Sequence, residues 1–297
     1  MASLQTEQPT IASLQTEQPT MASLQHLSFH NRDCKIHYWY RKGTSQRYVM
    51  LLHGGGIDHQ MFETQIQAFD ESFHLLIWDA RGHGLSRLPA EKRFNFEDMI
   101  ADCLQLYRLY DINQAILVGQ SMGGNLAQEI AYRYPQKVER LVLIDCMRNT
   151  SSLTLIERLL IKLAGPIMYL YPMKTLIKQS AAACSNREDV RQYVREVLSQ
   201  STRREFIDII NATMACLHED SNWRFPQPVL LLCGEDDKSG IIKKTVFPWA
   251  ESDPQISLHI IDGASHNSNQ DQPEVVNRLI AEFVGSNPTL FSKELVN

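Results

Sequence analysis

A serine flanked by glycines is the first feature of the sequence that could do chemistry. The segment Gly-Gln-Ser-Met-Gly, residues 119–123, follows an apolar run and precedes a stretch with helical spacing. In this pattern the serine lies on a sharp strand-to-helix turn, where side chains in place of the two glycines would collide with a neighbouring strand or helix. The free N–H groups of that helix can help to hold an anion beside the serine. The pattern therefore predicts that Ser121 is a nucleophile rather than a helix-capping residue.

A serine hydroxyl needs a base, and His266 is the histidine best placed to supply one. It follows the last strand-like run and precedes the final predicted helix. A loop in that position belongs at the carboxyl ends of the strands, beside Ser121. The other nine histidines lie in or beside predicted strands, near glycine turns or at the end of a helical segment, where histidines are usually structural. We therefore predict that His266 is the general base.

Acidic residues cluster where another strand is predicted to end. Glu235, Asp236 and Asp237 directly follow the apolar run 228–234. One of these carboxylates would bond to His266, fix its tautomer and stabilise the imidazolium, and the others would be solvated loop charges. Asp145, at the end of the preceding strand, is a further candidate. Spacing alone does not choose among the four.

A run of glycines, residues 54–56, follows the first long buried strand. Consecutive glycines let backbone N–H groups approach a ligand without side chains in the way. The run predicts an oxyanion hole made by one amide of this loop and by the amide of Met122, the residue after the nucleophile. Serine, base and acid supply all the chemistry, so the sequence predicts neither a metal nor an organic cofactor.

The elements that must position these residues alternate between strands and helices. An antiparallel hairpin is predicted first, within residues 27–43, and Asn95 is predicted to cap one of the helices that follow. Alternation of this kind indicates an α/β fold with a mostly parallel, doubly wound sheet. The predicted strands are 48–53, 74–80, 115–120, 140–146, 228–234 and 257–262, and the predicted helices are 61–69, 94–112, 125–135 and 272–285.

Residues 147–225 interrupt this alternation, because they contain helix-like segments only. An insertion after the sixth strand of such a sheet commonly forms a lid over the site. We therefore predict a helical cap over 147–225 and a core over 26–146 and 226–297. Charged and helix-breaking residues interrupt the apolar stretch 153–176, which favours a lid helix facing a pocket over a membrane-surface helix. The segment 165–173 predicts an apolar, aromatic lining for that pocket.

Composition restricts the partners and the location of the protein. The chain has 297 residues and a net charge of −5 without a basic stripe, which disfavours nucleic acid and anionic membranes as partners. Its six cysteines lack metal-site spacing, and no apolar run reaches the roughly 20 residues that cross a membrane. The sequence therefore predicts a cytoplasmic protein without stable membrane insertion, and nothing in it indicates an oligomeric state. Residues 1–25, with two copies of ASLQTEQPT, predict a disordered leader.

Five motifs resemble those of the α/β-hydrolase superfamily and follow one another in the order typical of it, in particular of its branch with a helical cap. The resemblance covers residues 27–285 and implies that Asp237 is the acid and that Gly55 donates the second oxyanion amide. It also implies structural roles for Arg81 and His83. A serine nucleophile, where related dehalogenases and epoxide hydrolases have aspartate, disfavours those two chemistries. The motifs are LLHGGG (51–56), WDARGHGLS (78–86), GQSMGGNLAQEIAYRYPQKVERLVLID (119–145), VLLLCGEDD (229–237) and IDGASHNSNQDQPEVVNRLIAEFV (261–284).

The motifs are most similar to those of esterases, enol-lactonases and carbon–carbon bond hydrolases. This resemblance implies a serine hydrolase that cleaves a small or medium carboxylic ester or lactone through an acyl-enzyme. Two alternatives stay open from the sequence. One is an acyltransferase or perhydrolase that uses the same triad, and the other is a slow-turnover, hydrolase-like ligand sensor.

Overall fold

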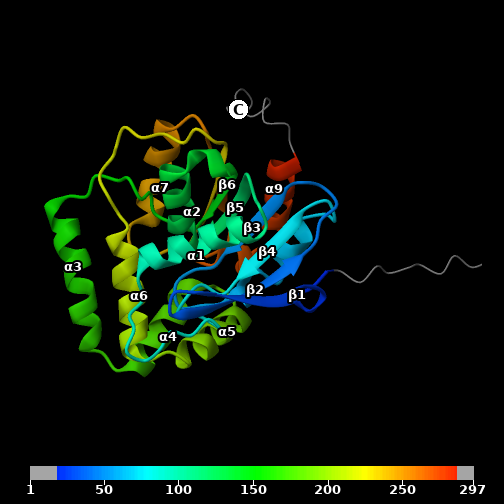
Figure 1. Cartoon of the computed structure of the whole chain (residues 1–297). Coiled ribbons are helices and arrows are strands. Elements are labelled where there is room, and N and C mark those ends of the chain that lie inside the picture. Colours follow the sequence, from blue (N-terminus) through cyan, green and yellow to red (C-terminus); the bar gives the residue numbers. More distant parts are fainter. Residues whose placement is uncertain (1–18, 286–297) are drawn as a thin grey trace, which may run out of the picture.

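An eight-stranded sheet with helices on both faces forms the centre of the computed structural model, which describes residues 19–285 (Figure 1). The strand order is β1-β2-β4-β3-β5-β6-β7-β8, and β2 pairs antiparallel with both β1 and β4 while the strands from β4 to β8 pair in parallel. The predicted opening hairpin and doubly wound parallel sheet are thus confirmed. The strands are β1 (Gln25–Asn31), β2 (Cys34–Arg41), β3 (Tyr48–Leu52), β4 (His74–Trp78), β5 (Ala115–Gln120), β6 (Val138–Ile144), β7 (Val229–Gly234) and β8 (Ile256–Ile261).

The central strands are apolar on both faces because helices cover both. In β3, Met50 and Leu52 face one hydrophobic cluster, whereas Val49 and Leu51 face the other. Burying each such side chain contributes about 1.5–3 kcal/mol. On the first face lie α1 (Phe96–Leu109), α2 (Met122–Arg133) and α7 (Ile242–Ser252), and on the second lie η2 (His59–Phe62), η3 (Gln65–Ala68) and α9 (Pro273–Gly285).

Two of the predicted helical elements differ in the structure. The helix expected over 61–69 is instead two short 3₁₀ turns, η2 and η3, whose apolar residues pack into the cluster that α9 also joins. The sequence also gave no sign of α7, because Pro248 interrupts its helical pattern. Asn95 caps α1 as predicted, since its side chain accepts a hydrogen bond from the Glu97 amide at 2.8 Å.

The folded chain begins earlier than the predicted boundary at residue 26. Met21 and Leu24 are buried in the second cluster, and the Met21 amide donates a hydrogen bond to the Glu63 carboxylate at 3.0 Å. The third, partial copy of the repeat, residues 22–25, is therefore part of the fold and leads directly into β1. The two full copies lie largely outside the described residues.

Four helices lie between β6 and β7, in the stretch where the sequence predicts helices only. They are α3 (Leu155–Tyr169), α4 (Met173–Cys184), α5 (Glu188–Ser199) and α6 (Arg203–Ala215), and they gather at one end of the sheet (Figure 1). Thr154 and Thr202 begin α3 and α6 with reciprocal capping boxes. Among the described residues, no helix is long and apolar enough to cross a membrane.

Candidate active site

Ser121 lies on a strained turn between β5 and α2. Its φ is +48° and its ψ is −113°, which a residue with a side chain adopts only when the surrounding structure enforces it. Its amide donates to the Ile144 carbonyl of β6 at 2.9 Å, and its carbonyl accepts from the Asn125 amide at 2.9 Å. These bonds fix the turn, so that the hydroxyl lies at the N-terminus of α2.

The two glycines of the motif have the steric roles predicted for them. A Cβ on Gly119 would clash with the backbone of Gly123, in the first turn of α2. A Cβ on Gly123 would clash with the carbonyl of Leu52, at the end of β3. Close packing of strand, turn and helix therefore excludes side chains at both positions.

The structure brings Ser121, His266 and Asp237 together in a hydrogen-bonded series. His266 Nε2 lies 3.1 Å from Ser121 Oγ, and His266 Nδ1 lies 3.0 Å from Asp237 Oδ2. Burial alone would lower the pKa of His266, but the hydrogen bond and charge of Asp237 offset it, so the pKa is raised above its ordinary value. Burial alone would raise the pKa of Asp237, but His266 and the Ser239 amide lower it below its ordinary value.

The other three candidate acids do not contact His266. Glu235 and Asp236 are exposed, and Asp236 accepts a hydrogen bond from the Asn186 side chain at 2.9 Å. Asp145 is fully buried, with a φ of +48°, and accepts from the amides of Gly234 and Ser268 at 2.7 and 2.9 Å. The alternatives that sequence spacing left open are thus separated by contacts between distant loops.

Asp145 supports the two loops that carry Asp237 and His266. Burial is the main cause that raises its pKa to about 7, while the charge of His266 opposes this rise and that of Asp237 adds to it. Asp145, Cys233 and Asp237 place potential metal-ligand atoms within 4.8 Å of one another. However, the carboxylates of both aspartates already accept hydrogen bonds, and burial raises the pKa of the Cys233 thiol to about 12. The cluster is therefore better explained as a hydrogen-bonded support for the loops than as a metal site.

Gly55 and Met122, the predicted oxyanion donors, lie side by side. A Cβ on Gly55 would stand 3.8 Å from the Met122 Cβ and 3.0 Å from Cγ2 of Ile209. Ile209 belongs to α6, so a side chain at Gly55 would press against the helices above the sheet. Met122 is the first residue of α2, where backbone N–H groups have no partner within the helix. Met122 directly follows Ser121, and Gly55 borders the same cavity as Ser121.

A cavity of about 650 Å³ opens over Ser121 and His266. Its walls are mainly aliphatic and come from the loop after β3, from α3, α5 and α6, and from residues 239–242. The aromatic lining predicted from residues 165–173 is wrong, because none of these residues borders the cavity and Tyr169 and Tyr171 are exposed. The side chains that form the aliphatic wall include Leu160, Ile161, Val194, Leu198, Ile209 and Met214.

The loop after β4 is structural, as the family resemblance implies. Arg81 is buried and donates two hydrogen bonds to the Asp102 carboxylate, at 2.6 and 2.8 Å. His83 is buried and bonds to the Arg81 carbonyl at 2.9 Å, and burial lowers its pKa to about 3. Neither side chain borders the cavity.

Two contacts that the sequence did not indicate join the helices α4 and α5 to the site. Tyr193 of α5 donates its hydroxyl to the Asp58 carboxylate at 2.9 Å, next to the glycine run. Ser185, after α4, donates to the buried Asp271 carboxylate, which also accepts from the Ser265 amide at 2.8 Å beside His266. Nothing local in the sequence signals these pairs, whose members stand 86 to 135 residues apart.

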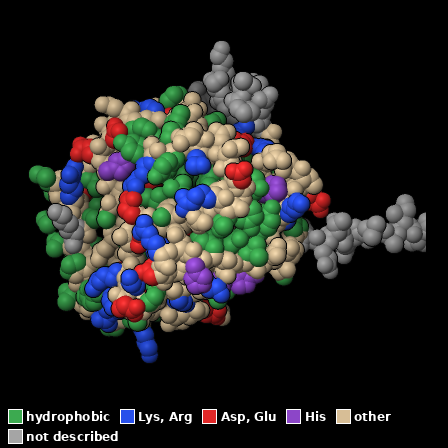
Figure 2. Space-filling model, in the orientation of Figure 1, with side chains coloured by type: hydrophobic (Ala, Val, Ile, Leu, Met, Phe, Trp, Pro, Cys, Tyr) green, Lys and Arg blue, Asp and Glu red, His purple; other side chains and the backbone are tan. Residues whose placement is uncertain are grey.

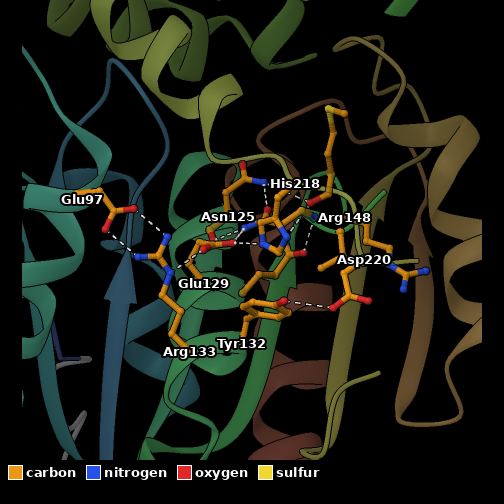
Figure 3. A network of polar contacts seen from close by, with 12 residues as sticks. Glu97, Asn125, Glu129, Tyr132, Arg133, Arg148, His218 and Asp220 are labelled. Atoms are coloured by element: carbon orange, nitrogen blue, oxygen red, sulfur yellow. Dashed lines mark hydrogen bonds and ion pairs between the residues drawn. The ribbon is translucent and has the colours of Figure 1, made fainter. Parts of the chain in front are cut away.

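A polar network anchors the two ends of the four-helix segment to α2 (Figure 3). The buried Glu129 carboxylate accepts hydrogen bonds from Arg133 at 3.0 Å, from Asn149 at 2.9 Å and from His218 at 3.0 Å. Asn149 precedes α3 and His218 follows α6. Because Ser121 directly precedes α2, the network fixes the helical segment to the helix that follows the predicted nucleophile.

Comparisons with known proteins agree with this fold and place the chain in a family. The model of the family described as serine aminopeptidase, S33, matches residues 43–273, and the chain therefore belongs to this family of α/β hydrolases. It is similar to 2-(acetamidomethylene)succinate hydrolase of Mesorhizobium japonicum, with 25% identity over 248 residues, which cover 80% of this chain and 87% of the relative. It is also similar to epoxide hydrolase 4 of Mus musculus, with 23% identity over 274 residues, 84% of this chain and 76% of the relative.

A solved structure shows the same fold at lower identity. The enol-lactonase of Burkholderia xenovorans superposes with a TM-score of 0.73 at 19% identity, over 88% of this chain and all of that structure. The family and these relatives together make the protein a hydrolase enzyme of the α/β-hydrolase superfamily. The names of the relatives refer to different bonds, so the bond that this protein cleaves must be argued from its own site.

Proposed function

We propose that the protein is a serine hydrolase that cleaves a small or medium carboxylic ester or lactone through an acyl-enzyme. The observation that carries the proposal is the series Ser121 Oγ, His266 Nε2, His266 Nδ1 and Asp237 Oδ2, with contacts of 3.1 and 3.0 Å at the floor of a cavity. A nucleophile, a base within hydrogen-bond reach and a group that orients the base are the requirements for acyl transfer.

In the proposed reaction, His266 takes the proton of Ser121 as the serine oxygen attacks the ester carbonyl. The amides of Gly55 and Met122 donate hydrogen bonds to the oxyanion that forms, a contribution of about 3–4 kcal/mol per donor. His266 then protonates the leaving alkoxide, and the acyl group remains on Ser121. A water molecule that gives one proton to His266 attacks this ester, and His266 passes the proton to the departing Ser121 oxygen as the acid is released. Asp237 holds the imidazole and stabilises its charged form throughout.

The cavity supports an apolar substrate group of modest size. About 650 Å³ lined by aliphatic side chains suits a small or medium acyl or alcohol group. In this proposal the helices of residues 147–225 act as a cap, because α3, α5 and α6 form much of the cavity wall. The substrate specificity of the enzyme would then depend on this cap rather than on the sheet.

Labelling with a fluorophosphonate probe tests the nucleophile. We expect wild type to be labelled and Ser121→Ala to lose both labelling and hydrolysis of p-nitrophenyl esters. Ser180→Ala is the matched control, since Ser180 also borders the cavity but lies outside the series. Undiminished labelling of Ser121→Ala would refute the assignment.

A substrate panel then tests the reaction. Aliphatic, aryl and lactone esters should be hydrolysed at rates that depend on the length of the acyl chain. Release of an acylated alcohol or a peracid instead of the free acid would indicate a transferase or perhydrolase. Probe labelling without turnover of any panel member would favour a ligand sensor.

A further inference from the structure

The helix α3 exposes an apolar face to solvent. Seven leucine and isoleucine side chains of α3 and the residue after it are at least 42% exposed. They are adjacent in the chain or three to four residues apart, so they form one stripe along the helix. Figure 2 shows hydrophobic side chains along the edge of the molecule that α3 forms in Figure 1. These residues are Leu155, Ile156, Leu159, Leu160, Leu163, Ile167 and Leu170.

The fold itself does not need this stripe. The opposite side of α3 packs on α6, where Gly165 approaches so closely that a Cβ would stand 2.6 Å from the Asn211 side chain. The described residues begin at Pro19, shortly before β1, and end with α9, and both β1 and α9 lie across the molecule from α3 (Figure 1). Exposed apolar patches of this extent usually mark an interaction surface.

The charges around the stripe are mainly basic. Residues 153–178 contain four basic residues and one acidic residue, a local charge of +3 in a chain of net charge −5. Lys174 and Lys178, which follow the stripe at the start of α4, are exposed and make no ion pair among the described residues. The acidic charges nearest the stripe are engaged, because Glu157 caps α3 and Glu219 pairs with Arg158 at 2.7 Å. The negative net charge of the whole chain therefore does not describe the basic surroundings of the stripe.

The stripe is continuous with the mouth of the cavity over Ser121. Leu160 belongs to the stripe and also borders the cavity, and Ile161 and Ala164 of the same helix line it as well. Any surface that covers the stripe therefore lies beside the entrance to the cavity.

We propose that α3 docks flat on an anionic lipid surface. The apolar stripe would enter the boundary between headgroups and acyl chains, while Lys174 and Lys178 would contact the anionic headgroups. A second copy of the chain is a poorer occupant, since symmetric pairing of two α3 helices would bring the same basic residues together. Docking would place the mouth of the cavity at the lipid surface, so that a lipophilic ester can enter the cavity from the lipid. This last consequence rests on the proposed hydrolase function, whereas docking itself does not.

Vesicle flotation with the full chain tests the proposal. We expect binding to phosphatidylcholine vesicles that contain 30% phosphatidylglycerol and little binding to phosphatidylcholine alone. The triple variant Leu155→Gln, Leu159→Gln, Leu170→Gln should bind at least about tenfold more weakly, because three buried contacts with the acyl region are lost. The matched control is Leu109→Gln with Phe247→Gln, two exposed apolar residues of α1 and α7 outside the stripe, whose loss should leave binding unchanged. Equal binding of the triple variant and wild type would overturn the proposal.

The charge of the surface is tested separately. Lys174→Glu with Lys178→Glu should weaken binding to the anionic vesicles and reduce its dependence on salt. Binding to neutral and anionic vesicles alike, unmoved by this variant, would overturn the assignment of an anionic surface. Light scattering without lipid adds a further outcome, since concentration-dependent dimers that the triple variant abolishes, without vesicle binding, would assign the stripe to a second copy.

Activity separates this proposal from the proposed function. The triple variant should hydrolyse a short, soluble p-nitrophenyl ester at the wild-type rate, because none of its three residues borders the cavity. Vesicle binding by the Ser121→Ala variant should equal that of wild type. Vesicle binding by wild type without hydrolysis of any ester would count against the hydrolase, and hydrolysis by wild type without vesicle binding would count against docking.

Discussion

Replacing Asp237 by Asn tests whether this carboxylate holds the imidazole of His266, the proposed base, in its working tautomer. Asp237 accepts hydrogen bonds from His266 Nδ1 at 3.0 Å and from the Ser239 amide at 2.7 Å. An asparagine that keeps its oxygen toward Ser239 presents its NH₂ group to His266. The imidazole must then carry its proton on Nε2, where it can no longer accept the proton of Ser121.

The expected loss is about 10⁴-fold in kcat, the usual effect of fixing a triad histidine in the wrong tautomer. At about 1.36 kcal/mol per tenfold change, this corresponds to roughly 5.5 kcal/mol of lost transition-state stabilisation. Asp236→Asn is the matched control. Its exposed carboxylate bonds only to Asn186 among the described residues, so its loss should change kcat by less than about twofold.

The pH profile gives a second readout of the same variant. In wild type, kcat/KM should fall as the pH drops through the raised pKa of His266, because the protonated imidazole cannot act as a base. Without the charge of Asp237, burial dominates and lowers that pKa, so the acidic limb of the residual activity should move to lower pH. Equal turnover of the two asparagine variants, or an acidic limb that moves to higher pH, would refute the reasoning.

Three further predictions concern the framework of the site. Gly123→Ala should lower the free energy of unfolding by about 3 kcal/mol or more in urea denaturation, because its Cβ would clash with the backbone of β3. Tyr193→Phe should reduce kcat about tenfold with little change in KM. The variant loses the hydroxyl that orients Asp58 beside the glycine run of residues 54–56, which carries a proposed oxyanion donor. Arg81→Leu should destabilise the protein by about 3–5 kcal/mol, because it leaves the Asp102 carboxylate buried without its cation.

Each of these predictions has a control within the chain. Gly285→Ala adds a Cβ that meets nothing within 4 Å, so it should not destabilise the protein as Gly123→Ala does. Asp102→Asn combined with Arg81→Leu should recover part of the loss, since no unpaired charge remains. An unchanged kcat in Tyr193→Phe would show that the contact with Asp58 does not position the glycine run of residues 54–56.

Local signals in the sequence were sufficient for the sheet and for two residues of the proposed site. Strand periodicity located all eight strands, and the glycine pattern around Ser121 reflects the crowded turn that the structure shows. His266 was found from its place between the last strand and the last helix. These features depend on neighbouring residues in the chain, so the sequence carries them directly.

Tertiary structure decided what depends on contacts between distant segments. Asp237 meets His266 across 29 residues, while Asp236, its neighbour, points to Asn186, and only the folded loops distinguish them. The apolar pattern of α3 is the same whether its leucines face a cavity or solvent, because periodicity shows that a face exists and not what covers it. The sequence thus determined the fold and predicted the chemical type of the site. The packing of the inserted helices determined the shape of the cavity and left an apolar face exposed beside its entrance.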